Sequence, residues 1–140
     1  MADALKQRPQ YRNIHVTQLL GYRLPAPGWV SILHRISGLA LFLFLPFLVW
    51  LFDQSVTSEI SYERFSGLFR NGAGGFPGWF FKLIAFGLIW SYVHHFIAGV
   101  RHLWMDVTHS TGLGFGRQSA IVTLVLGVLV TLALGVKLFS

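Results

Sequence analysis

Three long apolar runs constrain the fold of this 140-residue chain more than any other feature. An α-helix needs about 20 mostly apolar residues to cross the hydrocarbon core of a bilayer. Residues 29–52, 79–104 and 119–139 each meet that length. A buried helix of a soluble protein keeps a polar stripe, whereas the stretches LALFLFLPFLVWLF and IVTLVLGVLVTLALGV are apolar on every side. The sequence therefore predicts an all-α fold, a bundle of three transmembrane helices.

Composition argues against several other classes of protein. Apolar residues make up 54% of the chain and charged residues only 11%, whereas an average soluble domain has about 25% charged residues. The absence of cysteine excludes disulfides, thiolate metal sites and iron–sulfur ligation on this chain. The basic residues that give the formal charge of +6 are scattered, without the basic face of a nucleic-acid-binding protein. We therefore expect contact with membrane lipid and not with nucleic acid.

The distribution of charge predicts the orientation in the membrane. The segment before the first run carries Lys6, Arg8, Arg12 and Arg23 against Asp3, whereas the loop after that run has more acidic than basic residues. The positive-inside rule therefore places the N-terminus in the cytoplasm and, after three spans, the C-terminus outside.

The N-terminal stretch lacks the apolar core of a cleavable secretory signal, and no transit peptide is evident. We therefore expect a multi-pass protein of a bacterial inner membrane. The expected segments follow in chain order: a cytoplasmic segment at 1–28, the first span at 29–52, an outer loop at 53–78, the second span at 79–104, an inner loop at 105–118 and the third span at 119–139.

Polar residues interrupt the first apolar run in the stretch SILHRISG. Ser31, His34, Arg35 and Gly38 stand at i, i+3, i+4 and i+7, so they share one face of a helix. An arginine near the centre of a span costs about 2.5–3.5 kcal/mol, and less near its end. A lone arginine there would be an anchor that reaches the lipid phosphates. With serine, histidine and glycine on the same face, the pattern favours an anion or a polar ligand between helices.

A second polar cluster, HHFIAGVRHLWMD, closes the second apolar run. His95 and His102 are seven residues apart, which places them on one face about 10 Å apart along the axis, with Gly99 between them. An imidazole facing into a membrane bundle can ligate haem iron, and His102, farther along the same face, could serve the haem propionates, which need cations or N–H donors. Both clusters are expected at the same membrane face, which predicts one cofactor site. A proton relay and structural hydrogen bonds between helices remain the alternatives.

The two motifs, in this order and with Arg-Pro near the start, resemble the cytochrome b membrane-anchor subunit of succinate dehydrogenase (succinate:quinone oxidoreductase, complex II). The likeness covers nearly the whole chain. It implies a three-helix anchor paired with a second hydrophobic anchor subunit, with one haem b between them. It also implies a complex with a flavoprotein and an iron–sulfur subunit that passes electrons from succinate to ubiquinone, in the respiratory chain and the tricarboxylic acid cycle. The succinate-oxidising site would not lie on this chain.

The resemblance also implies roles for individual residues. His95 would be an axial ligand of the haem iron, and the partner anchor would supply the opposite ligand. His34, Arg35 and His102 would lie near the haem propionates. Ser31 and Arg35 would line the ubiquinone pocket, which faces the iron–sulfur subunit.

One departure from the family pattern is a second histidine, His94, directly before the expected ligand. We favour His95 because it shares a helix face with Gly99 and His102, and His94 does not. Two other functions stay open at this point. One is the anchor of another quinone-linked reductase, such as a fumarate reductase, and the other is a haem-free structural or proton-conducting membrane subunit.

Overall fold

The computed structural model describes residues 15, 17–18 and 21–139 of the chain. The long helices and the short one between them are, in chain order, α2 (Ala26–Val56), α3 (Glu59–Arg70), α4 (Gly78–Thr108) and α5 (Leu113–Phe139). Helices α2, α4 and α5 are long and apolar enough to cross a membrane. The predicted all-α fold with three membrane spans is confirmed. Helix α3 lies within the range expected as an outer loop.

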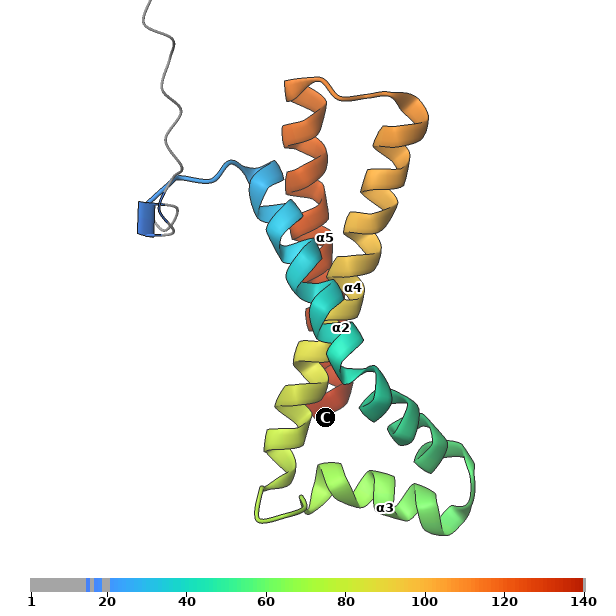
Figure 1. Ribbon diagram of the computed structural model, residues 1–140. Coiled ribbons are helices and arrows are strands. Elements are labelled where there is room, and N and C mark those ends of the chain that lie inside the picture. The colour runs from blue at the N-terminus through green and yellow to red at the C-terminus, as the bar shows by residue number, and fades with distance from the viewer. Residues whose placement is uncertain (1–14, 16, 19–20, 140) are drawn as a thin grey trace, which may run out of the picture.

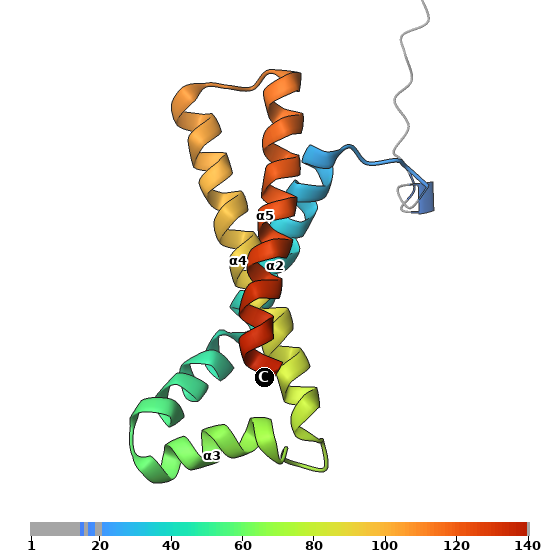
Figure 2. The ribbon, with the colours of Figure 1, turned by 180° about the vertical axis from the view of Figure 1, so that it is seen from behind.

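The three long helices cross near their middles and diverge on both sides of the crossing (Figure 1). The same crossing is visible from behind (Figure 2). Helices α4 and α5 are joined by a short connection at one end of the bundle, called the turn end below. At the opposite end, called the α3 end, α3 spans the distance between α2 and α4 (Figure 1). The chain therefore enters α2 at the turn end, where the two polar motifs also lie.

Prolines and serines set several of the helix limits. Pro27 lies in the first turn of α2, where its missing N–H would have no acceptor within the helix. Ser58 caps α3 by accepting a hydrogen bond from the Ser61 N–H, and Ser61 completes a capping box. Pro46 lies inside α2 and removes one hydrogen bond of that helix. Helix α2 changes direction in its second half (Figure 1), as expected for a proline kink.

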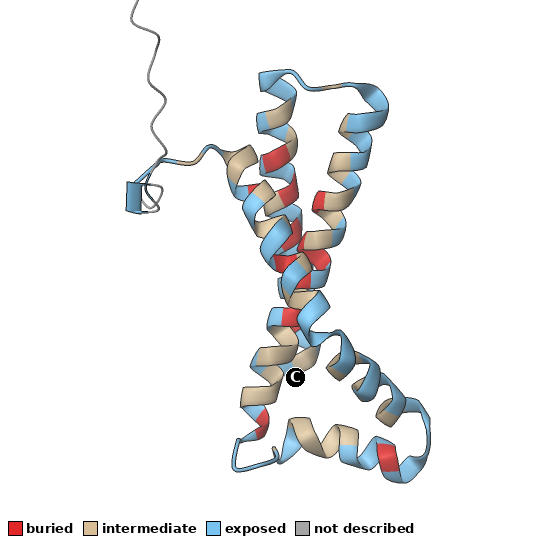
Figure 3. Ribbon diagram, viewed as in Figure 1, coloured by how far each residue is buried: buried red, intermediate tan, exposed pale blue. Residues whose placement is uncertain are grey.

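Helix α5 packs through a stripe of small residues. Its buried residues recur every three or four positions, so they form a single face: Ala120, Thr123, Gly127, Thr131 and Gly135. A Cβ atom at Gly135 would overlap the ring of Phe86 on α4. Membrane helices associate through close packing because apolar surface gains little by leaving lipid. The buried positions accordingly gather around the crossing of the helices (Figure 3).

Helix α2 is the least covered of the three spans. In its most apolar window 6% of the residues are buried, against 28% in α4 and in α5. Phe42, Leu43 and Phe52 project from it with more than half of their surface exposed. Such side chains are unfavourable in water. In a membrane they face lipid or another membrane protein, so α2 is the helix of this bundle with the most surface left for a partner.

Candidate functional site

Three histidine rings meet between α2 and α4. The centroids of His34 and His95 are 4.2 Å apart and their planes differ by 18°, so the rings stack. The centroids of His34 and His102 are 5.2 Å apart, with a tilt of 44° between the planes. The first motif contributes His34 from α2, and the second contributes the other two rings from α4. The predicted meeting of the two polar motifs is therefore confirmed.

Helix α2 fixes the orientation of the His95 ring. The Nδ1 atom of His95 lies 3.1 Å from the backbone oxygen of His34 and 3.4 Å from Oγ of Ser37. The Ser37 hydroxyl donates to the same backbone oxygen, at 2.9 Å. A carbonyl oxygen only accepts hydrogen bonds, so the proton of the neutral ring is on Nδ1. The lone pair is then on Nε2, which makes no hydrogen bond to any residue that the structure describes.

A glycine on α2 makes room for this ring. A Cβ atom at Gly38 would stand 2.8 Å from Cε1 of His95 and 3.1 Å from its Nδ1, closer than side-chain atoms pack. At Gly99, which the sequence analysis singled out, a Cβ atom would be 3.8 Å from Nε2 of His34, an ordinary contact. The close approach between α2 and α4 thus depends on the glycine of the first motif rather than on that of the second.

His94 lies in a different environment from its neighbour, against α5 and close to the backbone of Val30 on α2. It is 1% exposed, and its ring stacks on that of Trp90, with centroids 5.5 Å apart and planes 17° from parallel. A Cβ atom at Gly127 of α5 would lie 3.5 Å from its Nδ1. Its Nε2 is buried without a hydrogen-bond partner in the described part of the chain. His94 therefore has no nitrogen open to a ligand outside the bundle, in contrast to His95.

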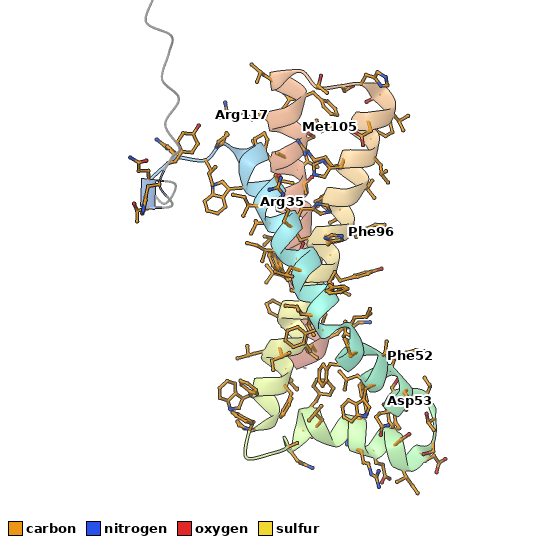
Figure 4. The ribbon with its side chains drawn as sticks, in the orientation of Figure 1. Arg35, Phe52, Asp53, Phe96, Met105 and Arg117 are labelled. Atoms are coloured by element: carbon orange, nitrogen blue, oxygen red, sulfur yellow. The ribbon has the colours of Figure 1, made fainter. Side chains whose placement is uncertain are left out.

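Of the remaining predicted site residues, His102 is part of the cluster, whereas Ser31 and Arg35 do not join it. His102 and Ser31 are half-buried, and Arg35 is exposed. Figure 4 shows Arg35 on the half of α2 nearest the turn end. The side chains of Ser31 and Arg35 form no hydrogen bond or ion pair with the residues that the structure describes, so their donors are available to other groups.

One residue of the cluster escaped the sequence analysis. Ser37 is fully buried and its hydroxyl contacts both His34 and His95. The sequence feature that could have identified Ser37 is its position three residues after His34, one turn farther along the first apolar run. Within the described residues, no group of three or more histidine, cysteine or acidic side chains is arranged to hold a metal ion. The cluster thus offers a metal one ordered imidazole nitrogen, which suits a metal whose other ligands come from elsewhere.

The fold and this cluster define a small membrane-spanning subunit with an ordered histidine between two of its helices. The chain belongs to the succinate dehydrogenase/fumarate reductase transmembrane subunit family, whose model matches residues 5–134. It is 30% identical over 124 residues to the succinate dehydrogenase cytochrome b556 subunit of Coxiella burnetii, which covers 89% of this chain and 92% of that protein. It is 28% identical over 121 residues to the subunit of the same name from Paracoccus denitrificans, covering 86% and 84%. The resemblance inferred from the two motifs is confirmed.

Proposed function

We propose that this chain is the cytochrome b anchor of a succinate:ubiquinone oxidoreductase, and that Nε2 of His95 ligates the iron of a haem b. The observation that carries the proposal is the hydrogen bond between His95 Nδ1 and the backbone oxygen of His34. Metal-binding histidines almost always donate their other ring N–H in this way, which fixes the ring and raises its basicity. The names of the two relatives, both cytochrome b556 subunits, support the same cofactor.

The donor set fits a haem shared with a second anchor subunit. Iron in a porphyrin needs only axial ligands from protein, so the single open nitrogen of His95 is sufficient on this side. The opposite ligand would come from the partner anchor, for which the largely uncovered α2 offers apolar surface. A bound haem b supplies reversible one-electron transfer. His34, Arg35 and His102 would provide N–H donors and positive charge for its propionates.

Ser31 and Arg35 would line the ubiquinone pocket, on the side that faces the iron–sulfur subunit. Their donors are not used within the described chain. The Ser31 hydroxyl would donate a hydrogen bond to a quinone carbonyl. The Arg35 guanidinium would stabilise the negative charge that develops on the oxygen before protonation. Two electrons and two protons convert ubiquinone to ubiquinol, and the electrons would come from succinate oxidised on the flavoprotein subunit.

The proposed location is a bacterial inner membrane, with the N-terminus in the cytoplasm. The excess of basic residues in the first 28 residues supports this orientation. The turn end of the bundle, with both polar motifs, would then face the cytoplasm. The iron–sulfur and flavoprotein subunits would bind there, within electron-transfer reach of the histidine cluster.

A reduced-minus-oxidised optical spectrum of the complex, purified through a tag on this chain, tests the haem assignment. We expect a sharp low-spin b-type signal that His95→Ala abolishes and that His109→Ala, a change at an exposed histidine outside the spans, leaves intact. Loss of the signal in His94→Ala but not in His95→Ala would mean that the ligand is the neighbouring residue. Absence of haem from an intact multi-subunit complex would instead favour a structural or proton-conducting subunit.

Steady-state assays test the quinone site. We expect Ser31→Ala or Arg35→Ala to lower ubiquinone reduction at least about tenfold, because each removes a donor to the developing charge. Succinate oxidation by an artificial acceptor should remain unchanged in the same preparations. An equal fall in both activities in a correctly assembled complex would contradict the proposed roles. If the complex turned over faster with fumarate and a quinol than with succinate and a quinone, it would act as a fumarate reductase.

A further inference from the structure

Arg101 lies on α4 directly before His102 in sequence, but it contacts α5 rather than α2. Its Nε donates to Oγ of Ser119 at 2.9 Å, and one of its terminal nitrogens donates to the backbone oxygen of Gly116 at 3.1 Å. A guanidinium has five N–H donors, so three remain after these two bonds. No carboxylate in the described chain forms an ion pair with it. A half-buried cation in a membrane span is costly without an anion.

A cleft between α4 and α5 opens beside this arginine. Its volume is about 430 Å³. Apart from Arg101 its walls are mostly apolar, and they include Val100, Trp104, Phe115 and Val122. Helices α4 and α5 diverge in this region, toward the turn end (Figure 1). The cleft thus combines one unneutralised cation with a long apolar wall, which matches a ligand that has an anionic head and a hydrocarbon tail.

The depth of Arg101 fits the headgroup boundary of a bilayer. Helix α4 has 31 residues, a length of about 46 Å at 1.5 Å per residue. The hydrocarbon core is about 30 Å thick, so roughly 8 Å of a centred helix projects at each end. Arg101 lies seven residues before Thr108, the last residue of the helix, or about 10 Å from that end. Its guanidinium therefore reaches the level of the lipid phosphates.

We propose that this cleft binds one anionic phospholipid of the leaflet at the turn end. The phosphodiester accepts hydrogen bonds from the free donors of Arg101, and an acyl chain lies along Val100, Trp104 and Val122. The positive end of the α5 dipole, close to Gly116, adds to the attraction for an anion. An inorganic anion would leave the apolar walls unused. This site is separate from the histidine cluster and does not depend on haem or quinone.

The experiment uses the whole complex, delipidated in detergent. Phosphatidylglycerol, phosphatidylcholine and inorganic phosphate are each added, and bound lipid is counted by native mass spectrometry alongside the thermal unfolding midpoint. We expect phosphatidylglycerol alone to raise the midpoint and about one molecule to remain bound. Arg101→Gln should weaken its binding at least about tenfold, because it removes charge-assisted hydrogen bonds to the phosphodiester.

Two further variants separate the site from general effects of charge and folding. Val122→Trp fills the cleft while Arg101 stays, and should also lose the lipid. Arg117→Gln removes an equal charge from an exposed position on the same end of α5 and should keep it. Equal binding of phosphatidylglycerol by Val122→Trp and Arg117→Gln would overturn the proposal. So would equal stabilisation by inorganic phosphate or phosphatidylcholine, or a photo-crosslink from position 122 to another subunit.

Discussion

His94 and His95 are neighbours in sequence but lie in different environments. The ring of His95 lies against α2, where a backbone oxygen and a serine hydroxyl fix its Nδ1 and leave Nε2 open. The ring of His94 lies against Gly127 of α5, is 1% exposed, and has an Nε2 without a partner. One step of about 100° around a helix therefore separates an oriented imidazole with an open nitrogen from a fully buried one. The groups packed around each ring therefore distinguish two histidines that are adjacent in sequence.

The two interfaces also differ in what brings the helices together. Between α4 and α5, small residues at every third or fourth position allow close packing, and the hydroxyls of Thr123 and Thr131 bond within their own helix. Near the turn end, Arg101 also bonds across this interface to α5. Between α2 and α4, polar contacts cross from one helix to the other through His34, Ser37 and His95. The first interface is mainly one of close packing, and the second fixes the orientation of the His95 ring.

The largest effect is expected from Gly38→Val on the α2–α4 side. The added side chain would occupy the space of the His95 ring, because even a Cβ atom there would stand 2.8 Å from Cε1. We expect the b-type optical signal to disappear although every histidine is still present. Gly99→Ala is the matched control and should keep the signal, since its Cβ atom would be 3.8 Å from the nearest ring nitrogen. A normal spectrum in Gly38→Val would show that the ring is not positioned by this contact.

On the α4–α5 side, an intermediate effect on stability is expected at His94. His94→Ala should destabilise the complex by about 2 kcal/mol or more, because it leaves a cavity in a fully packed site. His94→Leu should cost less than half as much, since it fills the space and removes a buried nitrogen that has no partner. Thermal unfolding of the two variants measures the difference, and the haem signal should persist in both. If leucine destabilised as strongly as alanine, Nε2 would have to make a bond in the complex.

The smallest effect is expected at Ser37. Ser37→Ala removes the 3.4 Å contact of the hydroxyl with His95 Nδ1 but leaves the bond to the His34 backbone oxygen. The haem should stay bound, and its midpoint potential should rise, because a less basic imidazole stabilises the oxidised iron less. The lost hydrogen bond is expected to contribute about 0.5–1 kcal/mol. For a one-electron couple this corresponds to a rise in midpoint potential of roughly 20–45 mV.

Redox titration of Ser37→Ala beside Thr131→Val makes this measurement. Thr131 loses a hydroxyl that bonds only to Gly127 of its own helix, so its potential should not move. A fall in the potential of Ser37→Ala, or an equal shift in both variants, would contradict the role assigned to the serine.

The sequence predicted features that depend on hydropathy and on helical period. Apolar length alone identified the three spans, and charge asymmetry with the positions of the motifs predicted that the two polar clusters would lie at the same membrane face. The contacts of Ser37 and the close approach at Gly38 depend on the rotation of α2 against α4, which no single-helix pattern encodes. Helix α3 was missed because it is amphipathic and short, so it lacked the apolar length that identified the others.

The acceptor that orients His95 is a main-chain oxygen, and every residue type at position 34 carries one. Substitution of His34 would remove its imidazole while the acceptor for its neighbour persists. The orientation of the His95 ring is thus resistant to mutation at position 34, which provides the acceptor, and is vulnerable at Gly38, which makes no hydrogen bond to the ring. Substitutions at position 38 are therefore expected to change the orientation of the His95 ring. Substitutions at position 34 are expected to remove only the contributions of the His34 ring itself.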